Sequence, residues 1–146
     1  MRNLVNIVTV RRLTPEDKPD WLRMRLLLWP NHTPADLLTD MDNILASQDE
    51  QPVFIALQGA GRPVGFLEAG LRKYADGCET SPVGYIEGWF VDAKLRRQGV
   101  GTALVHAMET WARDRGLIEI ASDTWLDHEI SIAAHTRLGY VVTERA

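Results

Sequence analysis

The stretch Leu95-Arg96-Arg97-Gln98-Gly99-Val100-Gly101-Thr102 decides the fold expected of this chain, because it separates the most strand-like segment from the longest amphipathic one. Residues 85–91 (YIEGWFV), just before it, are rich in aromatic and β-branched side chains and predict a strand. After it, apolar residues recur at the period of a helix, at Val100, Ala103, Leu104, Ala107, Met108 and Trp111. Gly116 is placed to end that helix. We therefore expect a strand, a glycine-bearing loop and a helix in succession.

This loop has the layout of an anion site, because glycines let the backbone approach a ligand and the first helical N–H groups lack partners. Gly99 and Gly101 could also form no more than a tight turn. A P-loop is disfavoured by the missing Gly-Lys-Ser/Thr ending, and a dinucleotide fingerprint by the missing third glycine. The remaining pattern, Arg-x-x-Gly-x-Gly, resembles the coenzyme A pyrophosphate loop of the GCN5-related N-acetyltransferases (the GNAT family).

Length and composition predict one globular domain over residues 1–146. Apolar residues make up 45% and charged residues 25%, which is ordinary for a globular protein. We expect neither a membrane helix nor a signal peptide, because no apolar run approaches about 18 residues and the N-terminus has no signal-peptide pattern. The single cysteine, Cys78, excludes an internal disulfide framework and agrees with a reducing cytoplasm.

Charge and histidine spacing narrow the choice of partner. The net charge of −4 argues against nucleic acid and favours a cationic partner. The four histidines show no zinc-ligand spacing with a carboxylate, so no metal site is expected.

The remaining chain supplies the other elements of the expected fold. Thr14 and Thr33 are placed to cap two helices, because each is followed directly by proline. We expect strands at 5–10, 53–57, 64–71, 117–121 and 140–142, helices at 15–29, 35–46 and 127–138, and a polar loop at 76–82. The order β-α-α-β-β-β-α-β-α-β predicts an α/β fold with a central mixed sheet flanked by helices, including one parallel pair joined by a right-handed crossover. The same order is found in the GNAT family, so the resemblance covers nearly the whole chain.

Several further stretches resemble one subgroup, the bacterial aminoglycoside 6′-N-acetyltransferases. They are LWP at 28–30, Tyr74, ETSPV at 79–83, EG at 87–88, ASDT at 121–124, IS at 130–131 with His135, LGY at 138–140 and TER at 143–145. This resemblance implies an antibiotic-resistance enzyme that transfers an acetyl group from acetyl-CoA to the 6′-amino group of an aminoglycoside, by direct attack in a ternary complex. It also implies a homodimer. The cysteine count, the net charge and the lack of a long apolar run lead us to expect a cytoplasmic protein that binds neither nucleic acid nor a membrane.

The resemblance also implies which residues form the two sites. The aminoglycoside would be bound by Trp29, Tyr74, Glu79, Glu87, Asp123 and Glu144. Acetyl-CoA would be held by Trp89, Phe90 and Val91 through their backbone and by Arg96, Arg97, Gln98, Gly99, Val100, Gly101 and Thr102 of the loop, together with His128. His128 departs from the asparagine expected in the subgroup. Relatives also continue into a further strand after the TER match, whereas this sequence ends at Ala146. Either a tail is absent from this sequence or one sheet edge is open, and an open edge would favour pairing between subunits.

The residue types suit such a substrate on chemical grounds. A polycation rich in hydroxyl groups needs carboxylates, and Glu87 and Asp123 lie in or beside apolar strands, where a lone charge is costly. Glu87 could instead point to the solvent face of its strand, and Asp123 could cap a turn. Trp29 and Tyr74 could bind sugar rings or serve as ordinary core or rim aromatics. Glu144 would otherwise be an exposed residue near the terminus.

Three residues are candidates for the chemistry itself. Glu87 or Asp123 would take the proton of the attacking amine, directly or through water. A disrupted strand ladder near Gly88 could free a backbone N–H for the thioester oxygen. His135, on the last expected helix, could protonate the thiolate or could be a polar residue packed under that helix. The rival functions are acetylation of a polyamine or a protein N-terminus, and acetyl-CoA binding without catalysis.

Overall fold

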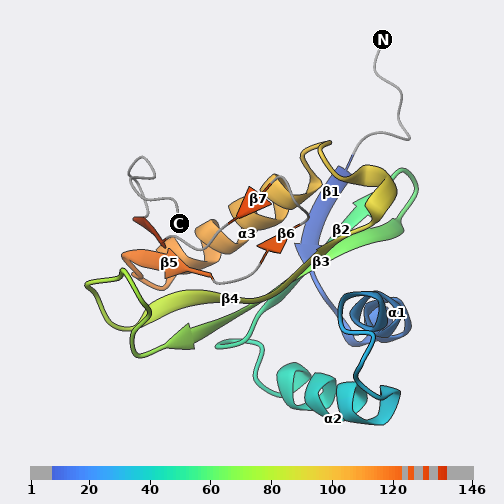
Figure 1. Ribbon diagram of the computed structural model, residues 1–146, viewed down its shortest axis with the longest axis horizontal. Helices are drawn as coiled ribbons and strands as arrows, with labels where there is room; N and C mark the ends of the chain where they lie inside the picture. Colours follow the sequence, from blue (N-terminus) through green and yellow to red (C-terminus); the bar gives the residue numbers. More distant parts are fainter. Residues whose placement is uncertain (1–7, 123–124, 127–129, 132–134, 138–146) are drawn as a thin grey trace.

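The computed structural model describes residues 8–122, 125–126, 130–131 and 135–137 (Figure 1). In chain order the elements are β1 (Val8–Arg12), the 3-10 turn η2 (Pro15–Asp17), α1 (Lys18–Leu28), α2 (Pro34–Leu45), β2 (Val53–Gln58), β3 (Arg62–Arg72), β4 (Val83–Val91), η3 (Ala93–Leu95), α3 (Val100–Asp114), β5 (Glu119–Ala121), β6 (Trp125–Leu126), β7 (Ile130–Ser131) and β8 (His135–Arg137). Within this part of the chain, no helix is long and apolar enough to cross a membrane.

The sheet is mixed, as the sequence predicts. Its strand order is β1-β2-β3-β4-β5-β8, and β6 and β7 form a separate two-stranded sheet. β2 and β3, which cover the strands expected at 53–57 and 64–71, form an antiparallel hairpin. β4 and β5 form the expected parallel pair, with α3 as the connection between them. The parallel register is short, joining Gly84 to Ile120 and Tyr85 to Ala121.

The helix expected over residues 127–138 is wrong for the residues of that range that the structure describes. Ile130–Ser131 forms β7, paired with β6, and His135–Arg137 forms β8, paired antiparallel with β5. The backbone of β8 thereby satisfies the N–H and C=O groups that β5 would otherwise leave as an open edge, and this pairing overrides the local helical pattern. Residues 5–7 of the first expected strand and all of 140–142 lie outside the described residues.

The core lies in two layers, one on each face of the sheet. One cluster packs α3 on the sheet through residues such as Leu67, Leu104 and Met108. The other packs α1 and α2 on the opposite face through Trp21 and Phe66 among others. Figure 1 shows α3 on one side of the sheet and the two N-terminal helices on the other. Each such buried side chain contributes about 1.5–3 kcal/mol of apolar transfer free energy.

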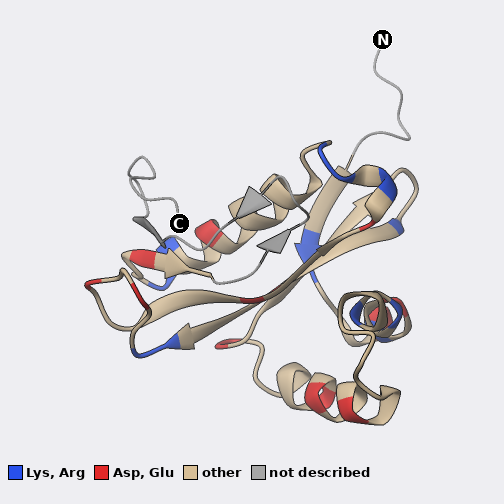
Figure 2. Cartoon of the chain, in the orientation of Figure 1, with Lys and Arg blue, Asp and Glu red and all other residues tan. Residues whose placement is uncertain are grey.

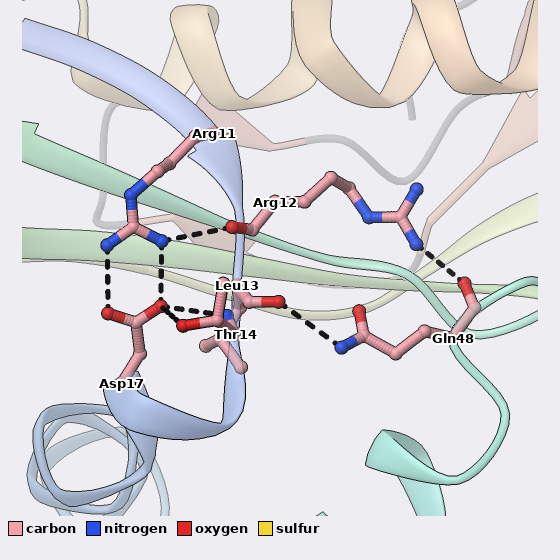
Figure 3. Close-up of polar contacts among 6 residues, drawn as sticks. All are labelled: Arg11, Arg12, Leu13, Thr14, Asp17 and Gln48. Carbon is pink, nitrogen blue, oxygen red and sulfur yellow. Dashed lines mark hydrogen bonds and ion pairs between the residues drawn. The ribbon is translucent and has the colours of Figure 1, made fainter.

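A polar cluster fixes the angle at which the chain passes from β1 into α1 (Figure 3). Arg11 donates two hydrogen bonds to Asp17, at 2.7 and 2.9 Å, and the backbone N–H of Thr14 donates to the same carboxylate at 2.8 Å. The Arg11 hydrogen bond is the main reason that the pKa of Asp17 is lowered. The helical segment therefore starts after Thr14 as expected, although its first turn is 3-10. Thr33 caps α2: its hydroxyl accepts a hydrogen bond from the N–H of Asp36 at 3.1 Å.

Candidate active site

A β-bulge at Glu87 is the centre of the candidate site. Glu68 of β3 pairs with Gly88 and Ala69 pairs with Ile86, so Glu87 is an extra residue in β4 with no counterpart. The disrupted ladder expected near Gly88 is therefore confirmed. Glu87 is the only exposed residue of β4. Bulges bend a strand and redirect its side chains and N–H groups, and here the redirected side chain is a carboxylate.

Glu87 forms an ion pair with Arg72, at the end of β3. Arg72 donates from Nε to Oε2 at 3.1 Å and from Nη2 to Oε1 at 2.8 Å. The Glu87 side chain is 39% exposed and the Arg72 side chain is 46% exposed. The guanidinium also lies 3.7 Å from the ring centroid of Tyr85. Glu87 thus lies on a solvent-accessible face of its strand, and it already binds a cation there.

A pocket of about 410 Å³ opens beside this ion pair. It is lined by Arg72, Tyr74, Ala75, Asp76, Tyr85, Ala121 and Ser122. The volume falls within the range of small-molecule sites. Tyr74 is 79% exposed, so it is a rim aromatic and not part of the core. Tyr74, which the sequence predicted to bind substrate, therefore lines the same pocket as Arg72, the ion-pair partner of Glu87.

Buried carboxylate contacts anchor the loop that forms one wall of the pocket. The backbone N–H groups of Glu79 and Thr80 donate to Glu119 at 2.8 Å each, and the Thr80 hydroxyl donates at 2.6 Å. Glu119 is fully buried in β5. Burial, with a smaller effect of Glu119, raises the pKa of Cys78 in the same loop to about 11. The side chain of Glu79, a predicted substrate ligand, is exposed and does not line the pocket.

Trp29 lies against the bulge at Gly88. It is the C-cap of α1, and its ring atoms Cη2 and Cζ2 are 2.8 and 3.2 Å from where a Cβ on Gly88 would lie. Gly88 therefore permits a close approach of ring and backbone that any side chain would prevent. The guanidinium of Arg25 lies 5.0 Å from the Trp29 ring centroid, and the His32 ring meets Trp29 edge-on at 6.3 Å. Trp29, a predicted substrate-binding residue, thus lies beside Gly88, which follows Glu87 in the chain.

A buried ion pair supports this arrangement, and the sequence analysis did not find it. Arg25 donates to both carboxylate oxygens of Glu68, at 2.7 and 2.8 Å, and also to Asp40 at 2.7 Å. The Trp21 indole N–H donates to Glu68 at 2.9 Å. Burial by itself would lower the pKa of Arg25, but the hydrogen bonds and charges of Glu68 and Asp40 outweigh it and raise that pKa. The available signal was a glutamate in the apolar strand VGFLEAGL, the same signal that identified Glu87.

The glycine loop has the expected place between β4 and α3, and its shape suits a diphosphate. Arg97 and Gly99 both have positive φ, 68° and 87°, and Gly99 is the N-cap of α3. A Cβ on Gly99 would meet nothing within 4 Å, so its backbone borders open space. Basic residues gather in this loop (Figure 2). Successive N–H groups in such turns, next to a helix N-terminus, form an anion-binding surface.

The other predicted cofactor residues are consistent with contact through the backbone alone. The side chains of Trp89, Phe90 and Val91 are all buried in the two core clusters. The carbonyl of Val91 accepts a hydrogen bond from Nε of Arg96 at 3.2 Å, which ties the loop to the strand end.

Of the remaining predicted site residues, one lies in a different element than expected and three lie outside the described residues. His135 lies in β8, opposite Ala121, and not on a helix as expected, because β8 completes the sheet beside β5. Asp123, His128 and Glu144 lie outside the described residues. In the part of the chain that the structure covers, no group of three or more potential metal ligands occurs.

Comparisons with known proteins agree with this geometry. Residues 21–140 match the acetyltransferase (GNAT) family. The chain is 41% identical over 133 residues to an aminoglycoside N(6′)-acetyltransferase type 1 of Klebsiella aerogenes, covering 90% of this chain and 88% of that protein. It is 42% identical over 138 residues to the protein of the same name from Stenotrophomonas maltophilia, covering 94% and 88%. The solved structure of AAC(6′)-Iy in complex with the bisubstrate analogue CoA-S-monomethyl-acetylneamine has a TM-score of 0.79 at 31% identity, covering 96% of this chain and 98% of that one.

Proposed function

The chain belongs to the acetyltransferase (GNAT) family, and on this premise we propose that it transfers the acetyl group of acetyl-CoA to the 6′-amino group of aminoglycosides. One observation carries the substrate class: an exposed carboxylate, Glu87, projects from the bulge beside the pocket and already binds a guanidinium. The proteins that the chain resembles at about 40% identity bear the name of this activity, which makes antibiotic resistance its biological consequence.

Each part of the site has a role in this proposal. When bound, acetyl-CoA supplies the acetyl group as a thioester. The backbone of residues 98–102 would hold its diphosphate, because the N-terminus of α3 and the basic loop attract an anion there. Glu87 would bind the substrate's ammonium group and accept its proton, directly or through water, so that the nitrogen becomes nucleophilic. Trp29 and Tyr74 would provide apolar faces for sugar rings, as exposed or half-buried aromatics can.

Further features of the proposal rest on the sequence. Asp123 would be a second carboxylate of the site, Glu79 and Glu144 would bind other ammonium groups, and His128 would contact the cofactor. His135 would protonate the departing thiolate. We also propose a cytoplasmic homodimer. Light scattering at micromolar concentration should report twice the mass of one chain, and a mass equal to one chain would contradict the dimer.

Product analysis tests the reaction. The protein is incubated with acetyl-CoA and either kanamycin, tobramycin, a 6′-hydroxyl aminoglycoside, spermidine or a short peptide, and thiol release and product mass are measured. We expect acetylation at the 6′-amino group, and binding of the 6′-hydroxyl analogue without acetylation at that position. Acetylated peptide or spermidine, with no acetylated aminoglycoside, would contradict the proposal and support the corresponding rival activity.

Two carboxylate variants test the proposed amine site. Glu87→Gln and Asp123→Asn should each lower turnover by about tenfold or more, the scale for losing a positioned proton acceptor. Glu50→Gln, an exposed glutamate outside the pocket, is the control and should retain wild-type turnover. Wild-type kinetics in both site variants would mean that these carboxylates do not act on the substrate.

A glycine variant tests the cofactor loop separately. Gly99→Val should weaken acetyl-CoA binding in calorimetry, because a β-branched residue disfavours the positive φ and crowds the anion surface. Gly61→Val is a matched control, since Gly61 also has positive φ and free space for a Cβ but lies in the β2–β3 turn. An equal loss of cofactor affinity in both variants would indicate general strain and not a cofactor site.

A further inference from the structure

The ion pair between Arg72 and Glu87 uses the carboxylate that the proposed function assigns to the substrate. Both oxygens of Glu87 accept an N–H from Arg72. An arriving ammonium group therefore meets a carboxylate whose charge is already offset by a cation of the protein. Arg72 also lines the pocket, so its positive charge faces any cation that enters. The substrate has to compete with this side chain.

The geometry favours exchange over permanent pairing. Both side chains are roughly 40% exposed or more, and water screens ion pairs at such positions, so the attraction to be overcome is small. The guanidinium also has a second partner, the Tyr85 ring, with its centroid 3.7 Å away. A cation over an aromatic face is held without a carboxylate. Arg72 can therefore release Glu87 and remain at the edge of the pocket.

We propose that Arg72 is a specificity-determining residue: its guanidinium occupies Glu87 in place of the substrate's ammonium group and is exchanged for it when a polycationic amine binds. This inference rests on the proposed function. Another acidic residue, Asp76, lines the pocket that opens beside Glu87 and can accept another ammonium group of the same ligand. An amine with several charges therefore displaces Arg72 more readily than an amine with one, because each added charge gains a partner while only one pair is broken.

Kinetics of Arg72→Gln test this competition. With saturating acetyl-CoA, KM should fall by about two- to fivefold, the scale of an exposed ion pair, while kcat is unchanged. The gain should be larger for aminoglycosides with few ammonium groups and should shrink at high salt. Arg72→Lys, which keeps the charge, should stay near the wild type. The control is Arg62→Gln, at the other end of β3, where an exposed arginine pairs with Asp92 at 3.8 Å; it should leave KM unchanged.

The opposite result has a clear meaning. A higher KM in Arg72→Gln would show that Arg72 holds Glu87 in place for the substrate, and an unchanged KM would show that the two cations do not compete. Either overturns the inference. The double variant Arg72→Gln, Glu87→Gln should show no gain over Glu87→Gln alone, and a full gain would place the effect of Arg72 elsewhere. If the wild-type protein acetylates no aminoglycoside, the proposed function fails and the role assigned to Arg72 fails with it. The result with wild-type protein thus separates the two failures.

Discussion

Two arginine–glutamate pairs lie at one bulge, and they differ mainly in their exposure to water. Glu68 and Glu87 each interrupt an apolar strand, and each receives two hydrogen bonds from one guanidinium. The side chains of Arg25 and Glu68 are 2% and 5% exposed, whereas those of Arg72 and Glu87 are 46% and 39% exposed. The buried pair fixes α1 and α2 to the sheet, and the exposed pair borders a pocket. The same two residue types thus provide structure in one place and an exchangeable charge in the other.

The largest difference should appear when one member of each pair is removed. Arg25→Met should lower the free energy of unfolding by about 3–5 kcal/mol, because it leaves the Glu68 carboxylate buried without its cation. Arg72→Met should lower it by less than about 1 kcal/mol, because Glu87 is exposed to water. Urea unfolding of the two variants measures both values. Similar losses of unfolding free energy in the two variants would mean that burial does not determine how much each ion pair contributes to stability.

Removing both members of the buried pair should be milder than removing one. In Arg25→Met with Glu68→Leu no buried charge is left alone, but the Trp21 indole N–H loses its acceptor. An unsatisfied buried donor costs about 1–3 kcal/mol, so the double variant should fall between wild type and Arg25→Met. The same unfolding experiment measures it. A double variant less stable than Arg25→Met would indicate that the Glu68 carboxylate stabilises the fold even without its arginine.

Gly88→Ala should disturb the side of the bulge that faces Trp29. The added Cβ would lie 2.8 Å from the Trp29 ring, and such overpacking costs about 1–3 kcal/mol. Gly70→Ala is the matched control on the exposed pair, because its Cβ would be 3.4 Å from Glu87, an ordinary contact. Thermal unfolding should show a clear loss for Gly88→Ala and little change for Gly70→Ala. Equal losses would indicate that the ring and the bulge are not in tight contact.

Salt should produce the smallest effect and act on one pair alone. The coupling energy of Arg72 and Glu87, from a double-mutant cycle, should fall between low salt and 1 M, where the screening length shortens from about 30 to about 3 Å. The coupling of Arg25 and Glu68 should change much less, since these two side chains are only 2% and 5% exposed. A salt-insensitive exposed pair would contradict the exchange proposed for Arg72.

The sequence predicted local features of the fold better than long-range ones. The strand, glycine loop and helix around residues 95–102 depend on neighbouring residues, and the structure has them as expected. For the described part of residues 127–138 the expected helix is wrong, because pairing with β5, a long-range contact, determines the conformation of His135–Arg137.

The candidate site shows the same division. A carboxylate in an apolar strand is visible in the sequence, and Glu87 was found that way. Its neighbour Glu68 carries the same signal, but the sequence does not reveal that its partner, Arg25, lies 43 positions away. The strand pattern also does not tell which of the two glutamates is buried, because the bulge at Glu87 changes the register of β4 relative to β3.

The Cys78 thiol, in the loop that forms one wall of the pocket, has a consequence for measuring the reaction. With a pKa of about 11, only about one thiol in ten thousand is ionised at pH 7. The thiolate is the form that attacks thioesters and disulfide reagents. Cys78 should therefore not be acetylated at an appreciable rate. It should also react slowly with the disulfide reagents used to measure the coenzyme A that is released. A colorimetric thiol assay at neutral pH should consequently report turnover against a low and steady background from the protein.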